Sequence, residues 1–193
     1  MLKRIDPVNY LLLVGVEMSF RVIHHEGDKD LLVEKVKVTA DQLKNDEYKD
    51  DFDFDEGEWE HAVDSVVNGN FSDPEIASLV LHLAIDTSFP AISEDCGISA
   101  YEALADRTSG KLAKTLRMFV HGRNFSTGNS GFGFGDEISC GYLASDEVRE
   151  FLELLKAYTP GSTAEDEKEF VDILIDSFST LVEKNSGDLF TMG

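Results

Sequence analysis

Hydrophobic and polar residues alternate along the N-terminal part of the chain. Between residues 14 and 22 every second residue is apolar, and a similar alternation follows Glu26-Gly27-Asp28. A period of two places the apolar side chains on one face of a β-strand. Because Glu26-Gly27-Asp28 is typical of a turn, the pattern predicts a β-hairpin over residues 11–38, with His24 and His25 exposed at its tip.

Further along, apolar residues recur every three or four positions, the spacing of one buried helical face. Helix starts are marked by capping side chains, as at Ser72 and Ser145. Shorter apolar runs at residues 138–143 and 189–192 predict strands, whereas residues 93–97 are expected to form a loop. The predicted helices cover residues 58–68, 75–86, 100–107, 112–120, 145–158 and 164–184.

The predicted elements indicate a single α+β domain over residues 1–193. We expect the N-terminal hairpin to extend into a small antiparallel or mixed sheet that is packed by five or six helices. The helix over residues 75–86 is apolar nearly all round, so it should lie at the centre of the fold. His82 within it is expected to be a hydrogen-bonded core or edge residue rather than a metal ligand.

A glycine- and aromatic-rich segment at residues 122–137 resembles a phosphate loop at first sight. A GxGxxG pattern from Gly131 would need glycine where Asp136 stands, and no serine lies in a GxSxG motif. Thr108-Ser109-Gly110-Lys111 also fails as a phosphate loop, because Leu112 follows the lysine. The segment is therefore predicted to be a mobile loop or a bulged edge strand, and it could roof a ligand pocket.

The strongest compositional signal is charge. The 193 residues include 38 acidic and 17 basic side chains, which gives a formal net charge of -21. Such a surface repels nucleic acid and anionic membranes and attracts basic proteins through long-range electrostatics. High solubility alone is the alternative explanation for this composition.

Carboxylates and aromatic residues are concentrated between residues 41 and 60. The segment fails as an EF-hand loop, because Glu56 and Ala62 stand where that loop needs glycine and glutamate. An anionic surface with aromatic side chains suits a basic protein partner, whereas the alternative is a solvated loop whose aromatics enter the core. The predicted partner-binding residues are Asp51, Phe52, Asp53, Phe54, Asp55, Glu56, Glu58 and Trp59.

Two cysteines, Cys96 and Cys140, are too few for a disulfide framework, so we expect reduced thiols in a cytoplasmic protein, with one disulfide as the alternative. No apolar stretch reaches the roughly 18 residues of a membrane span. The five histidines show no metal-ligand spacing, and no metal or cofactor is expected. A cysteine paired with His121 stays open as a catalytic dyad.

One modest basic cluster borders the glycine-rich segment. It consists of Arg117, His121 and Arg123, and we take these residues as a possible ligand pocket beneath the segment 122–137.

The C-terminal 50 residues resemble a group of small uncharacterised acidic bacterial proteins of immunity type. The resemblance rests on Gly141-Tyr142-Leu143-Ala144-Ser145-Asp146-Glu147-Val148, followed by a leucine-rich helix and an acidic final helix that ends in Gly-x-Leu. It implies a non-enzymatic protein that binds a basic protein partner, and it transfers no individual site residues.

The sequence thus favours an acidic, non-enzymatic protein-binding module of immunity or inhibitor type. One alternative is a small enzyme or ligand-binding domain whose pocket lies under the segment 122–137. Another is an inhibitor that imitates nucleic acid, since carboxylates can replace phosphates before a basic protein. Neither nucleic acid nor a membrane is expected as a partner.

Overall fold

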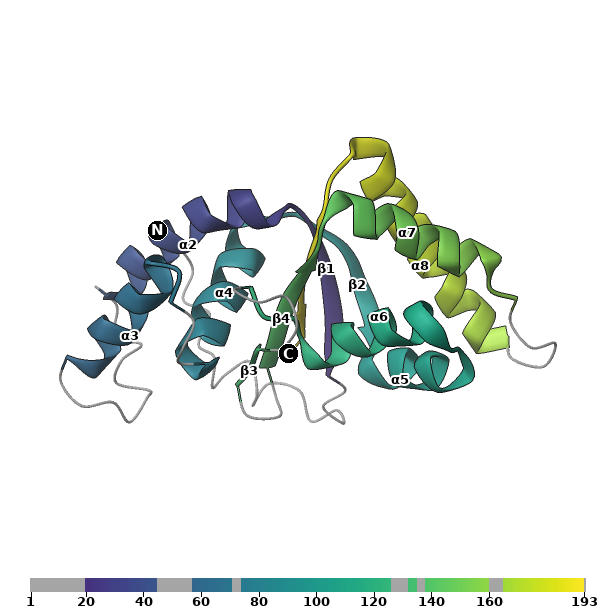
Figure 1. Cartoon of the computed structure of the whole chain (residues 1–193), viewed down its shortest axis with the longest axis horizontal. Coiled ribbons are helices and arrows are strands. Elements are labelled where there is room, and N and C mark those ends of the chain that lie inside the picture. The colour runs from purple at the N-terminus through teal and green to yellow at the C-terminus, as the bar shows by residue number, and fades with distance from the viewer. Residues whose placement is uncertain are drawn as a thin grey trace.

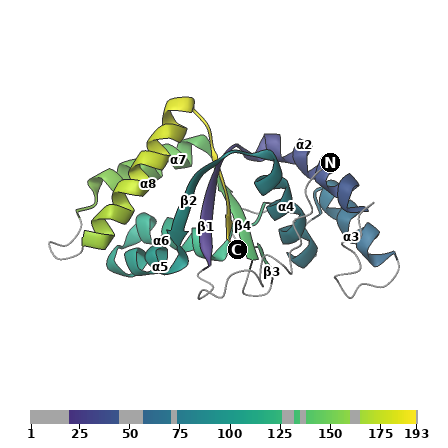
Figure 2. The same ribbon diagram turned by 180° about the vertical axis from the view of Figure 1, so that it is seen from behind.

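A central sheet separates two layers of helices (Figure 1). The computed structural model describes residues 20–44, 57–70, 74–125, 132–134, 138–159 and 165–192. Within these residues the helices α2, α3 and α4 lie on one side of the sheet, and α5 to α8 lie on the other (Figures 1 and 2). The α+β class is confirmed.

The described strands form one sheet in the order β2-β1-β5-β4-β3, and each neighbouring pair is antiparallel. The last of these strands in chain order, β5, is therefore the central one, and it is buried along its whole length. The strands are β1 (Arg21–Glu26), β2 (Ala91–Gly97), β3 (Phe132–Phe134), β4 (Ile138–Leu143) and β5 (Asp188–Met192).

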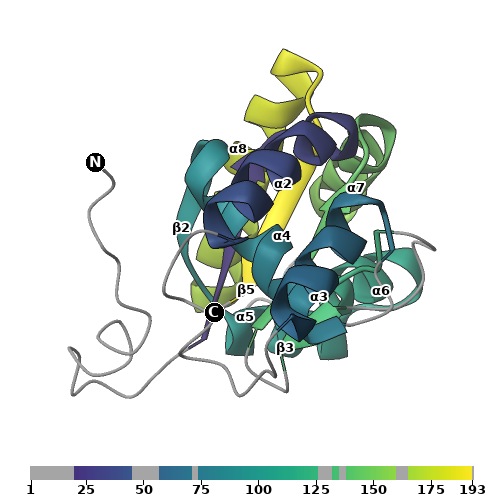
Figure 3. The same ribbon diagram turned by 90° about the vertical axis from the view of Figure 1, so that its left-hand side faces the viewer.

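Seven helices are present in the described residues, against the five or six expected from the sequence. The first layer, which faces the viewer in Figure 3, contains α2 (Lys29–Lys44), α3 (Glu58–Val67) and α4 (Pro74–Ser88). The second contains α5 (Ile98–Arg107), α6 (Gly110–His121), α7 (Ser145–Ala157) and α8 (Glu165–Lys184). None of these helices is long and apolar enough to cross a membrane.

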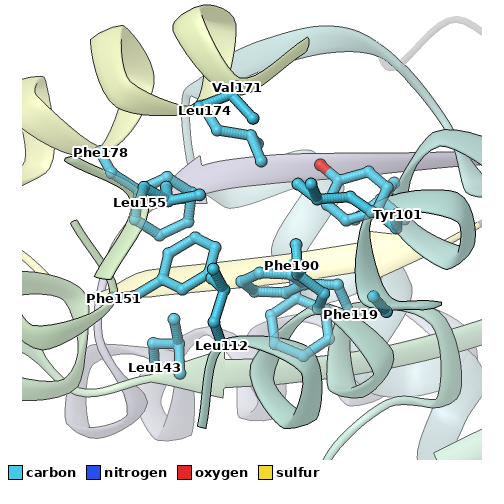
Figure 4. Packing of buried hydrophobic residues seen from close by; sticks show 14 of the residues in the cluster. Tyr101, Leu112, Phe119, Leu143, Phe151, Leu155, Val171, Leu174, Phe178 and Phe190 are labelled. Atoms are coloured by element: carbon cyan, nitrogen blue, oxygen red, sulfur yellow. The ribbon is translucent and has the colours of Figure 1, made fainter. Parts of the chain in front are cut away.

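The larger core lies between the sheet and the layer of α5 to α8. Its centre is aromatic, with Phe119 against Phe190 at 4.9 Å and Phe151 against Phe178 at 4.8 Å between ring centroids (Figure 4). Both pairs are close to edge-to-face, the arrangement that the ring quadrupoles favour. Each of these rings is almost completely buried, so this layer supplies much of the hydrophobic stabilisation.

The smaller core lies on the opposite face of the sheet. Leu32 and Val36 of α2 pack there with Val80 and Leu81 of α4. The strands contribute Leu189 to the same cluster. In this layer α4 packs directly on the sheet, and α2 packs on α4 (Figure 3).

The predicted N-terminal hairpin is wrong, because its second strand is part of the helix α2. Asp28 Oδ1 accepts hydrogen bonds from the backbone amides of Asp30 and Leu31, both at 3.0 Å, and so caps a helix. Leu32 and Val36 are four residues apart and satisfy a helical period as well as an alternating one. The other part of the predicted hairpin, residues 11–19, lies outside the described residues.

The other predicted elements agree with the structure, except for the strand β2 at one edge of the sheet. The predicted loop at residues 93–97 belongs to β2, which pairs with β1 at one edge of the sheet. At the other edge, Phe132–Phe134 forms the short strand β3, which is the edge-strand alternative for that part of the glycine-rich segment. The predicted helices after residue 57 and the strands 138–143 and 189–192 are confirmed.

A close approach in the sheet makes Gly141 of β4 sensitive to any side chain. A Cβ atom there would meet the ring of Phe190 and would lie 2.8 Å from the backbone nitrogen of Arg123. At Gly97 the nearest atom would be the hydroxyl of Ser99, at 3.9 Å. We expect Gly141→Ala to lower the free energy of unfolding by about 1–3 kcal/mol in urea denaturation. Gly97→Ala should change it by less than about 1 kcal/mol, and equal effects of the two would contradict this packing.

Candidate functional site

Most of the predicted partner-binding segment lies outside the described residues. This applies to Asp51, Phe52, Asp53, Phe54, Asp55 and Glu56. Glu58 and Trp59 are in the first turn of α3, where only their backbone is described. The segment therefore stays a prediction.

The predicted basic pocket residues do not come together around a described groove. Arg117 is exposed and pairs with Asp106, with 2.9 Å between Nη2 and Oδ1. His121 is the exposed last residue of α6. Arg123 donates to Glu147 Oε2 at 2.7 Å and stacks over the ring of Tyr142 at 4.4 Å. Arg123 therefore holds the chain segment after α6 against β4 and the start of α7.

An open groove of about 360 Å³ lies elsewhere, between the α5–α6 turn and the end of α7. Arg107 and Tyr158 line it, but both side chains are bound to the buried carboxylate of Glu167. The groove also includes Leu112 and Leu154 and contains none of the three predicted pocket residues. The charge of Arg107, which lines the groove, is therefore already paired with that of Glu167.

The structure corrects the prediction that His24 is exposed, because this side chain is completely buried in the larger core. His24 Nδ1 lies 2.9 Å from Asp188 Oδ2, and His24 Nε2 lies 2.7 Å from the hydroxyl of Tyr101. A neutral ring satisfies both contacts when Nδ1 donates to the carboxylate and Nε2 accepts from the hydroxyl. We call these three residues the His24 cluster.

The His24 cluster has the residue types of a proton relay, but it is closed to solvent. His24, Tyr101 and Asp188 are each 0% exposed. The ring of Phe119 packs at 4.7 Å and that of Phe178 at 5.1 Å from His24. A substrate could not reach these groups without unfolding the core. We therefore interpret the cluster as a structural hydrogen-bond network that connects α5, β1 and β5.

A second histidine cluster lies on the opposite face of the sheet. His25 is also buried, which corrects its predicted exposure. His25 Nε2 lies 3.2 Å from Asp86 Oδ1, and His82 Nε2 lies 3.1 Å from Asp86 Oδ2. The hydroxyl of Thr191 also donates to Asp86 Oδ1, at 3.0 Å. These four residues, the Asp86 cluster, connect α4 to β1 and β5, and His82 is hydrogen-bonded as the sequence predicted.

The Asp86 cluster stabilises opposite charges on two of its members. Burial raises the pKa of Asp86, but hydrogen bonds from His25 and His82 lower it by more, so this pKa lies well below the ordinary 3.8. Burial likewise lowers the pKa of His25, but the hydrogen bonds to Asp86 and to the Phe89 carbonyl raise it above 6.5. The pair therefore carries an ionised carboxylate and a histidine that holds its proton to a higher pH than usual.

The metal-ligand types of side chain and the thiol of Cys140 were the remaining candidates for chemistry in the described part of the chain. No group of three or more histidine, cysteine or acidic side chains there is arranged to hold a metal ion. Cys140 is buried, and burial raises the pKa of its thiol to about 12. Because the thiolate is the reactive form, Cys140 is not a nucleophile at neutral pH. The side chain of Cys96 lies outside the described residues.

The exposed face of α8 is a feature that the sequence analysis did not single out. Five carboxylates share this face, which we call the α8 acidic face, and its spacing of three, four or seven residues could have been recognised in the sequence. None of the five forms an ion pair with another described residue. Its members are Glu165, Glu169, Asp172, Asp176 and Glu183.

Comparison with known proteins gives no match: neither a family model, nor a curated protein, nor a solved structure corresponds to this chain. The resemblance of the C-terminal residues to immunity-type proteins is therefore untested and stays a prediction.

The His24 cluster generates a stability prediction. Tyr101→Phe removes the hydroxyl that meets His24 Nε2 and leaves a buried ring nitrogen without its partner. We expect a loss of about 1–3 kcal/mol in the free energy of unfolding, measured by urea denaturation. Tyr142→Phe is the matched control, because the Tyr142 hydroxyl bonds to no described residue, and it should change the value by less than about 0.5 kcal/mol. If Tyr101→Phe left the free energy of unfolding unchanged, the buried contact would contribute nothing to stability.

The thiol of Cys140 should be inert in the folded protein. In a Cys96→Ser variant, Cys140 is the only thiol that remains. At pH 8 a pKa of about 12 leaves about a thousandfold less thiolate than in an unperturbed cysteine. We expect no labelling by a disulfide reagent such as DTNB until denaturant is added, and one equivalent afterwards. Rapid labelling of the native protein would contradict the described burial.

Proposed function

We propose that the chain is an acidic, non-enzymatic protein-binding module whose partner presents a basic surface. The observation that carries this proposal is the α8 acidic face. Its carboxylates extend from Glu165 to Glu183, and at 1.5 Å per residue they span about 27 Å of helix. A face of this length suits a basic patch or a basic helix on a folded protein.

The arrangement of charges along α8 lowers the intrinsic stability of the helix. Like charges four residues apart, as in Glu165–Glu169 and Asp172–Asp176, cost about 0.2–0.5 kcal/mol per pair. Glu183 stands in the last turn, where the helix dipole disfavours an acid. Helix stability therefore does not account for the like-charged pairs or for Glu183, and we take these carboxylates as binding residues.

An apolar side chain lies beside the α8 acidic face. Ile173 is 39% exposed and stands four residues after Glu169 and three before Asp176. Interfaces combine an apolar core with a polar rim, and charge complementarity increases the association rate and the specificity. We propose that Ile173 contacts the partner while the surrounding carboxylates orient it.

The acidic and aromatic residues 51–59 belong to the same proposal as a second binding element. A module of immunity or inhibitor type would use such surfaces to block a basic protein in the cytoplasm, the compartment that the two cysteines suggest. The two acidic elements can be distinguished by mutating them separately.

Nucleic-acid imitation is a second candidate, favoured by the regular row of carboxylates on α8. Successive acids at three- and four-residue steps rise by about 4.5–6 Å along the helix. A partner that normally binds phosphates would then lose the complex when duplex DNA is added, whereas another basic partner would retain it.

The proposal is tested by reversing charges on α8. Partners are captured on the immobilised chain at low salt, and the captured protein is purified and its affinity measured by calorimetry. We expect Glu169→Lys combined with Asp172→Lys to weaken the complex by at least about tenfold. We also expect wild-type affinity to fall as salt rises, because exposed charges are screened within about 10 Å at 0.1 M.

A charge-matched control separates the α8 acidic face from net charge alone. Glu34→Lys combined with Glu102→Lys makes the same charge change at exposed positions on α2 and α5. This control should bind as the wild type does. Equal losses in both variants would leave only nonspecific attraction and would refute the α8 assignment. Reversal of Asp51, Asp53 and Asp55 tests the second element in the same assay.

A further inference from the structure

The ring of His25 stands between two hydrogen-bond acceptors. Nδ1 lies 3.2 Å from the backbone carbonyl oxygen of Phe89, and Nε2 lies 3.2 Å from Asp86 Oδ1. A carbonyl oxygen and an ionised carboxylate can only accept, so both ring nitrogens must carry a proton for both contacts to hold. The described geometry therefore corresponds to the imidazolium form of His25.

Loss of one proton from His25 breaks one of these two contacts. A neutral ring can keep the bond to Asp86 or the bond to Phe89, but the other nitrogen then directs a lone pair at an acceptor. The hydroxyl of Thr191 lies 3.5 Å from Nε2, but it donates to Asp86 Oδ1 at 3.0 Å and reaches a neutral Nε2 only by giving up that bond. The side chain of His25 is only 4% exposed, so water cannot readily replace the lost partner. Deprotonation thus removes a connection between β1 and the end of α4.

This connection lies where α4 turns into the edge strand β2. Phe89 N donates to Ile85 O at 3.0 Å, and Glu26 N donates to Pro90 O at 3.0 Å. His25 and Glu26 are on β1, so the Asp86 cluster and the Pro90 contact fix the same turn to the sheet. Opening of this turn would loosen α4 and, through it, the packing of α2 and α3.

We propose that the contacts of His25 with Asp86 and with the Phe89 carbonyl form a pH-sensitive switch that fixes the end of α4 to the sheet at mildly acidic pH and releases it at alkaline pH. The direction follows from the proton count. The form in which both contacts of His25 hold binds one more proton than the form in which one contact is lost. It is therefore favoured at low pH and weakened as pH rises through the pKa of His25. This inference does not depend on the proposed partner binding.

The charged and titratable neighbours agree with this direction. On α4, Asp86 and His82 face His25, and on β5 the buried Asp188 adds a further negative charge nearby. Cys140 on β4 stays uncharged at neutral pH because burial raises its pKa to about 12. Both carboxylates favour the protonated ring, and burial of the ring opposes it. The balance raises the pKa of His25 above 6.5.

The test is amide hydrogen exchange together with an NMR titration of the histidine rings in the full chain, from pH 5.5 to 8.5. After correction for intrinsic exchange, protection of the Glu26 and Phe89 amides should fall with rising pH. We expect a fall that levels off above the pKa of His25. Its midpoint should coincide with the titration of His25. The Val148 amide, which bonds to Ala144 O in α7, should keep constant protection.

A matched pair of variants identifies the titrating group. His25→Gln should abolish the pH dependence at Glu26 and Phe89, whereas His121→Gln, at an exposed position, should leave it as in the wild type. If His25→Gln does not fold, Asp86→Asn serves instead and should move the midpoint to lower pH. Constant protection of both amides in the wild type would overturn the proposal. So would a pH dependence that persists in His25→Gln or that is shared by Val148.

Discussion

The fold depends on satisfying polar side chains on both faces of one buried strand. β5 is the central strand of the sheet, yet it carries Asp188 on one face and Thr191 on the other. Burial of a polar group costs several kcal/mol unless a partner is supplied. His24 of β1 bonds to Asp188 on one face, and on the other Thr191 donates to Asp86 of α4, which also pairs with His25 of β1. The two histidines reach both sites because adjacent residues of a strand point to opposite faces.

The register of the sheet makes this double pairing possible. His24 is opposite Phe190 and His25 is opposite Leu189, so each histidine reaches the residue two positions from its direct partner. Such diagonal neighbours lie within reach of long side chains across a strand pair. A shift of β1 by one residue would exchange the faces of its two histidines, so that His24 would leave Asp188 and His25 would leave Asp86. The two histidines therefore specify the alignment of β1 with β5.

Much of the fold could be predicted from the sequence because most elements have a single dominant period. Phe170, Leu174, Phe178 and Leu181 of α8 form a helical stripe that has no competing interpretation, and all four are buried. The segment after Asp28 failed because its apolar residues fit both periods, and its helix is selected by the Asp28 cap and by packing against α4. The edge strand β2 lacks a hydrophobic pattern and depends on pairing with β1.

The histidine sites could not be predicted for a related reason. A His-His pair on a strand carries no information about burial until its partners are known. Tyr101, Asp86 and Asp188 are 60 or more positions away in the chain. The helical spacing of carboxylates on α8 was visible in the sequence, but its exposure on one face became clear only when the opposite face was seen to pack into the larger core.

The place of β5 in the sheet also bears on how the chain acquires its structure during synthesis. β1 pairs with β2, and β3 pairs with β4, but only β5 joins these two halves. In chain order β5 follows every other described element. The sheet can therefore be completed only after β5 has been synthesised, and until then β1 and β4 each have an unpaired edge. Such long-range pairing is slow and exposes strand edges to aggregation, so the two halves of the sheet should depend on rapid insertion of β5 or on protection by chaperones.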